Sequence, residues 1–190
     1  MKRWTRKAAG SLSAGLLAVG LFIGMSPMAQ ASVNPIPGVY SELFMPYSWN
    51  GSYSECLDVP GETTAIVGLQ IYHCHGYASN GAGQRWELLW FDSGYEIINS
   101  HSGKCIDYGG AGAQVVQNPC NGLRSQQWTF IQSVGLPDYV QLQNVDNPGF
   151  CMGLDWTLAE TNQQPVTSGW CQFNDPGNEA AYDNQLWALG

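Results

Sequence analysis

The pattern Gln-x-Trp occurs three times, and it constrains the fold of this chain more than any other feature. The three copies are Gln84/Trp86, Gln126/Trp128 and Gln185/Trp187. Six cysteines accompany them, and each copy follows its own two cysteines along the chain. Two cysteines and one motif that recur in this order indicate a supersecondary unit that is copied and packed against its siblings.

The cysteines predict a disulfide framework. They are Cys56, Cys74, Cys105, Cys120, Cys151 and Cys171. An even number of cysteines is typical of exported proteins that form disulfides. Six cysteines allow fifteen pairings, and sequence order favours Cys56–Cys74, Cys105–Cys120 and Cys151–Cys171. Each such bond contributes about 3 kcal/mol by chain entropy.

A zinc site is the alternative use of these cysteines, because His73 and His75 flank Cys74. Zinc ligands usually come in close pairs such as Cys-x-x-Cys, and the sequence contains no such pair. We therefore expect neither a metal site nor another cofactor. The two histidines are interpreted as solvent-facing neighbours of a disulfide.

Residues 1–31 have the pattern of a secretory signal peptide. Four basic residues stand among the first seven, an apolar run covers about 14–25, and Ala29-Gln30-Ala31 has the small-x-small form of a cleavage site. The apolar run is shorter than the roughly 20 residues that span a bilayer. We predict cleavage near Ala31 and a secreted protein without membrane insertion.

The rest of the chain is strongly acidic. The whole sequence has 7 Lys and Arg against 15 Asp and Glu, a formal net charge of −8. Four of the basic residues precede the predicted cleavage site, so the mature charge is −12, from three basic and fifteen acidic residues. Nucleic acids and anionic membranes are bound by basic surfaces. We expect no nucleic-acid partner, and neutral ligands suit this chain better.

The repeated units have the character of strands. Segments such as YEIINS, WTFIQS and DYVQLQNV are short, alternating and rich in aromatic and β-branched residues. Glycine, asparagine, serine and proline bound them, and the chain has 23 glycines and 10 prolines. The predicted class is all-β, one domain built from three pseudo-equivalent units.

Three cysteine-paired repeats that each end in Gln-x-Trp resemble the ricin B-type lectin family. This family comprises carbohydrate-binding β-trefoils of plant toxin B chains and of bacterial modules attached to xylanases, and the resemblance covers about residues 50–190. It implies a β-trefoil of twelve strands with one disulfide in each repeat. The predicted divisions are the signal peptide 1–31, an N-terminal segment 32–48 and the lectin domain 49–190, with lobes α (about 49–95), β (about 96–142) and γ (about 143–190).

In each motif the glutamine and the tryptophan project to the same face of a strand. Three tryptophans that converge in a threefold fold each bury on the order of 200 Å², while a glutamine amide can hold the backbone of a turn. We therefore assign a structural role to Trp86, Gln126, Trp128, Gln185 and Trp187.

The resemblance places sugar-binding residues elsewhere in the repeat. The family carries an aspartate two positions after the first cysteine, a Gln-x-aromatic just before the second, and often an asparagine before Gln-x-Trp. Such groups suit a pyranose, which offers hydroxyls and a flat C–H face. Lobe α matches through Asp58, Gln70 and Tyr72, with Gln84 included in the binding set, although Gly83 replaces the asparagine.

The other two lobes match less completely. Lobe β keeps Asp107, and Val116 and Asn118 replace the glutamine and the aromatic residue; we include Asp107 and Asn118 in the binding set. Lobe γ has Gly153 in place of the aspartate, and Thr167 and Gly169 before its second cysteine. A rebuilt γ site from Asp155, Trp156 or Trp170 is the alternative to a purely structural lobe.

The function predicted from the sequence is saccharide binding through shallow lobe sites, with lobe α the active one. No pair of carboxylates stands out for glycoside hydrolysis, so we expect no enzyme. The rival interpretation is a protein-binding trefoil, a secreted toxin subunit or an inhibitor. It rests on Phe44, Tyr47 and Trp49 in residues 32–50, which either dock a protein partner or cover the open end of the trefoil.

Overall fold

A computed structural model of the chain describes residues 40–45, 55–75, 81–133, 136, 138–155, 162–172 and 183–190. The predictions for the signal peptide 1–31, for Tyr47 and Trp49 and for Trp156 lie outside the described residues. Within these ranges the regular elements are strands and short 3-10 turns, without an α-helix. None of the helical turns found there is long and apolar enough to cross a membrane.

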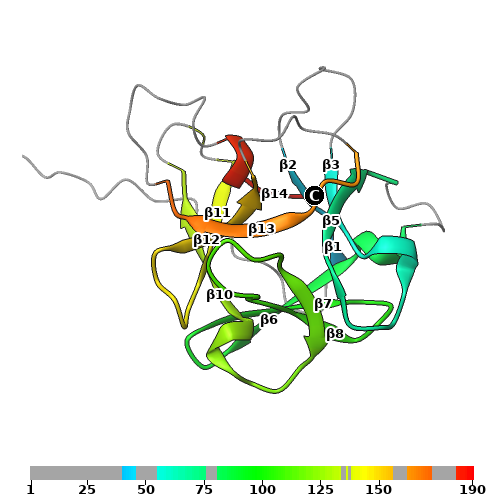
Figure 1. The fold of residues 1–190 in the computed structure, drawn as a ribbon, viewed down its shortest axis with the longest axis horizontal. Coiled ribbons are helices and arrows are strands. Elements are labelled where there is room, and N and C mark those ends of the chain that lie inside the picture. Colours follow the sequence, from blue (N-terminus) through cyan, green and yellow to red (C-terminus); the bar gives the residue numbers. More distant parts are fainter. Residues whose placement is uncertain are drawn as a thin grey trace, which may run out of the picture. The chain divides into compact units, whose positions relative to one another are not determined.

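Figure 1 shows the strands, which form three lobes in chain order. Lobe α contains β1 (Tyr40–Ser41), β2 (Leu43–Met45), β3 (Glu55–Asp58), β4 (Val67–Gly68), β5 (Gln70–His73) and β6 (Trp86–Phe91). Lobe β contains β7 (Gly94–Asn99), β8 (Lys104–Asp107), β9 (Val116–Pro119) and β10 (Gln127–Gln132). Lobe γ contains β11 (Val140–Asn144), β12 (Phe150–Leu154), β13 (Val166–Trp170) and β14 (Ala188–Leu189). One residue interrupts β1–β2 and one interrupts β4–β5, so the fourteen labelled strands correspond to the twelve of a β-trefoil.

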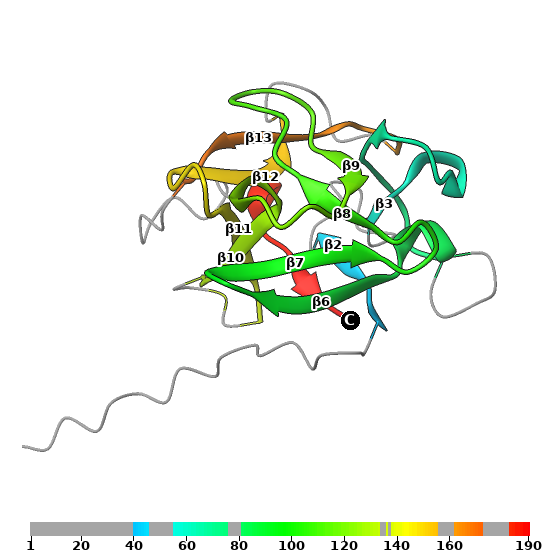
Figure 2. The same cartoon turned by 90° about the horizontal axis from the view of Figure 1, so that it is seen from below.

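The pairing of the strands repeats from lobe to lobe. The second and third strands of each lobe form the antiparallel pairs β3–β5, β8–β9 and β12–β13. The last strand of each lobe pairs with the first strand of the next, in β6–β7, β10–β11 and β14–β2. Figure 2 shows β6 and β7 as two long neighbouring ribbons. The predicted all-β trefoil with three equivalent units is confirmed.

The first strands of the trefoil lie before residue 49, where the sequence placed the start of the lectin domain. Leu43 and Met45 in β2 are buried, and Phe44 pairs with both Cys56 and Ala188. The backbone N–H and carbonyl groups of Glu42 also bond to Gly190, at 3.2 and 3.0 Å. The strand pairing of the trefoil therefore includes Tyr40–Met45, which lie before residue 49.

The three motif tryptophans meet in one core. Each has no exposed surface, and each belongs to the same cluster of buried residues. Each indole N–H donates to the carbonyl one position after the first cysteine of its lobe, over 3.1 Å to Leu57, 3.1 Å to Ile106 and 2.9 Å to Met152. A buried indole N–H requires such an acceptor. The same bond therefore fixes the same ring in all three lobes.

One disulfide closes the second and third strands of each lobe. The bonds are Cys56–Cys74, Cys105–Cys120 and Cys151–Cys171. The pairing favoured by sequence order is confirmed. In each lobe the second cysteine comes two residues after the register partner of the first, and these partners are Tyr72, Asn118 and Gly169. The strand pairing therefore brings the two cysteines of a lobe close together.

Candidate functional site

The glutamine of each motif ends a 3-10 turn and spans the second cysteine of its lobe. These turns are η2 (Ala82–Gln84), η3 (Arg124–Gln126) and η5 (Asp183–Gln185). In lobe α, Oε1 of Gln84 accepts from the backbone N–H of His75 at 2.9 Å, and its Nε2 donates to the carbonyl of His73 at 3.0 Å. Gln126 and Gln185 make the corresponding two bonds around Cys120 and Cys171.

Gln84 is therefore placed with the scaffold. Its side chain is fully buried, and the side chains of Gln126 and Gln185 are at most 3% exposed. Both ends of its amide already bond to backbone groups of the same lobe. Contact between Gln84 and a saccharide stays a prediction, and the geometry favours support of the residues that line the site.

Three polar or aromatic side chains share one face of the β3–β5 pair in lobe α. Asp58 ends β3 and lies opposite Gln70, and Cys56 lies opposite Tyr72. Residues two apart on a strand point the same way, so Asp58, Gln70 and Tyr72 come together. Nε2 of Gln70 donates to Oδ2 of Asp58 at 2.8 Å. A carboxylate, an amide and a ring thus line one side of this lobe.

Burial sets the charge behaviour of Asp58, which is only 6% exposed. Loss of water raises the pKa of its carboxyl above the ordinary value. Hydrogen bonds from Gln70 and Gln84 oppose this rise in pKa, and so does the nearby His75. The polar neighbours therefore stabilise the carboxylate form against the cost of burial.

Tyr72 is half-buried and is held by histidines. Its ring meets the ring of His75 edge to face, with centroids 5.3 Å apart, and lies 5.9 Å from that of His73. His73 in turn lies opposite Glu55, with Nδ1 2.8 Å from Oε1. The sequence showed these histidines beside Cys74, and the structure places them as supports of the candidate ring and of the strand pair.

Lobe γ forms part of the surroundings of the α site. The backbone N–H of Ile71 donates to the carbonyl of Gln164 at 2.9 Å, and that of His73 donates to Oδ1 of Asn162 at 3.2 Å. Strand β5 therefore borders a segment of lobe γ that is some 90 residues away in the sequence, as the separation of 89 for the second bond shows. No local sequence signal indicates this neighbour.

Lobe β keeps the carboxylate with a different set of partners. Oδ2 of Asp107 accepts from Nδ2 of Asn118 at 3.0 Å and from Nε2 of Gln126 at 3.1 Å. Val116 lies opposite Asp107, at the position that Gln70 has in lobe α. Asn118 has the position of Tyr72, so the amide is present and the ring is replaced.

In lobe γ, backbone atoms occupy the space at the position that corresponds to Asp58. Gly153 lies opposite Thr167, where the other lobes carry their aspartates. A Cβ atom on Gly153 would lie 2.3 Å from the carbonyl oxygen of Asn184 and 2.7 Å from Cγ of Gln185. Nδ2 of Asn184 also donates to the carbonyl of Leu154 at 2.6 Å. The backbone before the motif therefore fills the place of the missing carboxylate.

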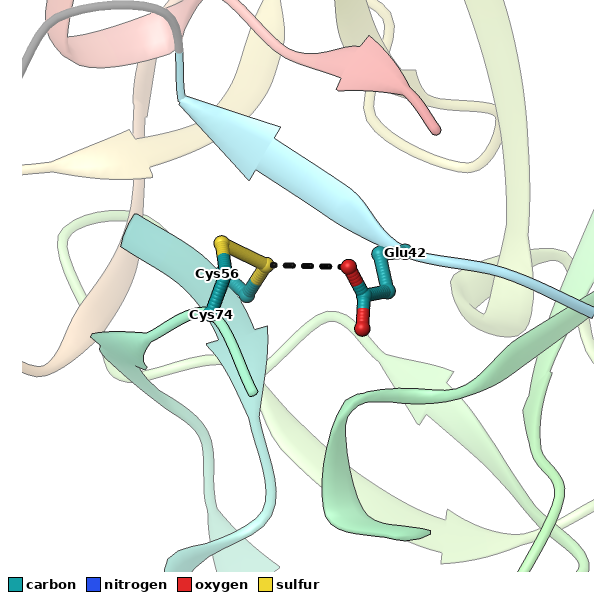
Figure 3. A group of neighbouring side chains, drawn as sticks. All are labelled: Glu42, Cys56 and Cys74. Atoms are coloured by element: carbon teal, nitrogen blue, oxygen red, sulfur yellow. Dashed lines mark hydrogen bonds between the residues drawn. A yellow bond between two sulfur atoms is a disulfide. The ribbon is translucent and has the colours of Figure 1, made fainter. Parts of the chain in front are cut away.

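A carboxylate also lies beside the α disulfide. Figure 3 shows Glu42 pointing toward the Cys56–Cys74 bond, with Oε2 3.9 Å from Sγ of Cys56. These three residues bring ligand-type atoms within 4.8 Å of one another. Zinc binds thiolates, whereas both sulfurs here belong to a disulfide. Burial raises the pKa of Glu42, and the charges of Arg85 and His75 oppose that rise.

Residues 82–169 match the family model of the ricin-type β-trefoil lectin domain-like proteins. Together with the threefold pairing described above, this match confirms the resemblance: residues 82–169 belong to a ricin-type β-trefoil lectin domain. The matched range contains lobe β and most of lobe γ, whereas Asp58, Gln70 and Tyr72 precede it. No curated protein matches the chain.

Solved structures of β-trefoils are similar to the chain. A designed threefold-symmetric protein, ThreeFoil, is 25% identical at a TM-score of 0.58, and the match covers 79% of this chain and 96% of that one. A ricin B-like lectin of Macrolepiota procera in complex with lactose is 16% identical at a TM-score of 0.60, with 81% and 96% covered. The Rhizoctonia solani agglutinin is 21% identical at a TM-score of 0.58, with 81% and 95% covered.

Proposed function

We propose that this protein is a secreted lectin and that its α lobe binds saccharides through Asp58, Gln70 and Tyr72. The observation that carries the proposal is the convergence of a carboxylate, an amide and a ring on one face of β3–β5. In the described part of the chain, lobes β and γ lack either the ring or the carboxylate at the corresponding positions. The lectin domain itself supports saccharide binding as the general function.

Each of the three side chains has a distinct task toward a pyranose. The Asp58 carboxylate accepts hydrogen bonds from sugar hydroxyls, and Gln70 donates and accepts through its amide. The 2.8 Å bond between them holds both groups before a ligand arrives, which reduces the ordering cost of binding. The half-buried ring of Tyr72 offers a surface for the C–H face of the sugar.

Lobe β is proposed as a weaker second site. Asp107 and Asn118 supply a carboxylate and an amide, joined by a 3.0 Å hydrogen bond. A sugar at this site meets no ring at the position of Tyr72, because Asn118 stands there. Gln84 and Gln126 act in both proposals as supports that hold the strand carrying the second cysteine.

The expected affinity of a single lobe is low. A hydrogen bond to a charged group contributes about 1.5–3 kcal/mol. One carboxylate and one ring in a shallow site correspond to a dissociation constant near 1 mM, about −4 kcal/mol. Polymers that engage more than one position on the domain therefore bind best.

We also propose that the protein is extracellular. Three disulfides in a domain of this size are typical of an oxidising, extracellular environment. Secretion by cleavage near Ala31 is proposed on the sequence of residues 1–31. Mass spectrometry of the protein recovered from the culture medium determines the mature N-terminus.

The proposal is tested by a glycan array and by titration of the purified protein with the glycans that bind. The decisive variant is Asp58→Asn, which keeps the shape and removes the charge, and Asp146→Asn on an exposed loop is its matched control. We expect saccharide binding in the wild type and in the control, and loss in Asp58→Asn. If the protein binds no glycan on the array and captures one protein partner, the result would support the protein-binding alternative instead.

A further inference from the structure

Three aromatic rings that the α site does not use form a stack where lobes β and γ meet. The Tyr108 and Phe150 rings have centroids 5.9 Å apart, and the Phe150 and Trp170 rings have centroids 4.4 Å apart with planes inclined by 31°. Tyr108 follows β8 of lobe β, and the other two rings belong to β12 and β13 of lobe γ. Trp170 is 72% exposed, so the outermost ring of the stack faces solvent.

This stack lies at a defined position of the repeat. Phe150 and Trp170 each precede a cysteine and are paired across β12–β13. The same position holds the Glu55 and His73 pair in lobe α and the Lys104 and Pro119 pair in lobe β. Successive strand residues point to opposite faces, so Trp170 and the position equivalent to Tyr72, which is Gly169, point to opposite sides. The stack is therefore distinct from the positions of Asp58 and Asp107 and from the equivalent Gly153.

The inner side of the Trp170 ring is supported. Phe150 stacks against it, and a Cβ on Gly149 would lie 3.4 Å from Cζ3 of Trp170. Gly149 has a φ of +125° and accepts a 2.7 Å hydrogen bond from the backbone N–H of Cys171. This φ favours glycine at the turn. The turn and Phe150 both lie beside the indole, and most of the Trp170 side chain stays exposed.

The size and charge of this surface indicate the ligand. Among the described residues, the other large exposed apolar side chains are Leu89, Trp90 and Phe91 on the β6–β7 hairpin, with Ile66 before β4 and Leu123 before η3. One indole offers on the order of 200 Å², far less than the roughly 800 Å² per partner of a stable protein interface. A pyranose ring matches one indole in size, and a neutral sugar suits a chain of net charge −8.

We propose that Trp170, supported by Phe150, is a second saccharide platform that stacks on the flat C–H face of a pyranose in a neutral polysaccharide. Tyr108 extends the stack toward lobe β, directly after Asp107. The inference rests on the proposed saccharide binding of the domain and adds a position that the lobe pattern does not include. A chain that contacts Trp170 and a lobe site together binds more tightly than at either one alone.

The test measures depletion of the full-length secreted protein from solution by insoluble cellulose, xylan and chitin. Trp170→Ala is compared with the wild type, with Tyr72→Ala and with Trp90→Ala, a matched control that removes another exposed tryptophan, 56% exposed on the β6–β7 hairpin. For the polymer that the wild type binds, we expect Trp170→Ala to weaken the affinity about tenfold and Trp90→Ala to leave it unchanged. Trp170→Phe, which keeps a flat ring, retains most of the binding.

The melting temperature separates loss of the platform from loss of the fold, and an exposed residue such as Trp170 should leave it nearly unchanged. Wild-type affinity of Trp170→Ala, with binding lost in Tyr72→Ala, would overturn this inference and leave the proposed α-lobe function standing. Loss in Trp170→Ala with full binding in Tyr72→Ala would support the platform and contradict the α-lobe assignment. No binding of the wild type to any of the three polymers would overturn the platform, and the glycan array then decides the proposed function separately.

Discussion

Lobes α and γ have the same scaffold and opposite surface chemistry. In both, a buried tryptophan donates to the carbonyl after the first cysteine, and a buried glutamine spans the second cysteine. At the position where lobe α carries Asp58, lobe γ has Gly153 under the carbonyl of Asn184. Three positions away along each strand, lobe α has Glu55 beside His73, and lobe γ has the aromatic pair of Phe150 and Trp170. Threefold repetition of the core therefore leaves each lobe free to carry its own surface.

The shared scaffold is tested by removing a core tryptophan. Trp128→Ala deletes a fully buried indole and its 3.1 Å bond to Ile106, and we expect a loss of about 3–5 kcal/mol in the free energy of unfolding. Chemical denaturation measures it. Trp90→Ala, at an exposed position, should change stability by less than about 0.5 kcal/mol. Equal and small effects of both variants would contradict the common core.

The closed position in lobe γ is tested with two glycines of the same strand pair. Gly153→Ala places a Cβ against the Asn184 carbonyl, whereas a Cβ on Gly169 meets its nearest atom, Nε2 of Gln185, at 3.4 Å. We expect Gly153→Ala to cost about 1–3 kcal/mol through overpacking and Gly169→Ala to cost less. Thermal unfolding ranks the two variants, and the reverse order would show that lobe γ has room for an aspartate.

The α site is tested through its ring. We expect Tyr72→Ala to weaken saccharide binding by at least about tenfold, and the melting temperature to fall by no more than a few degrees, since Tyr72 is half-buried at the surface of the lobe. Calorimetric titration and thermal unfolding give the two values. Tyr72→Phe is the matched control, because it keeps the ring. Unchanged binding in Tyr72→Ala would contradict the assignment of saccharide binding to lobe α, and with it the functional difference from lobe γ.

The pH dependence of binding follows from Asp58. Burial raises the pKa of this carboxyl, so its ionised form is lost at a higher pH than for an exposed aspartate. Saccharide binding should therefore weaken as the pH falls through the raised pKa. In Asp58→Asn the remaining binding should show no such dependence. Titrations at a series of pH values compare the two proteins, and parallel profiles would exclude Asp58 as the ligand group.

The effect of Asp58 on stability has the opposite sign. The folded state holds the proton of Asp58 more tightly than the unfolded chain does, because the pKa is raised on folding. The contribution of Asp58 to stability is thus largest below the unfolded pKa and falls as the pH rises through the folded pKa. Relative to Asp58→Asn, the wild type should lose melting temperature over this interval, and a gain there would contradict the assigned direction.

Much of the fold was predictable because it depends on local spacing that recurs. Three Gln-x-Trp motifs in step with three cysteine pairs predicted the trefoil and its three disulfides, and both are confirmed. The family resemblance implied that Asp58, Gln70 and Tyr72 belong to one site, and the pairing of β3 with β5 brings them to one face. The strands in Tyr40–Met45 were not predicted, because this segment carries no motif and pairs with β3, β6 and the distant C-terminal strand β14 only in the folded chain.

The sequence by itself determined the number of lobes, the residues that build their core and the positions at which each lobe differs. Only the tertiary structure decided what those differences mean. Gly153 is closed by the Asn184 carbonyl, Gln84 turns its amide to the backbone, and Trp170 stacks on Phe150. The physical reason is that a repeat is recognised by its local spacing, while the space and the contacts around a side chain depend on segments that come close only in the folded chain.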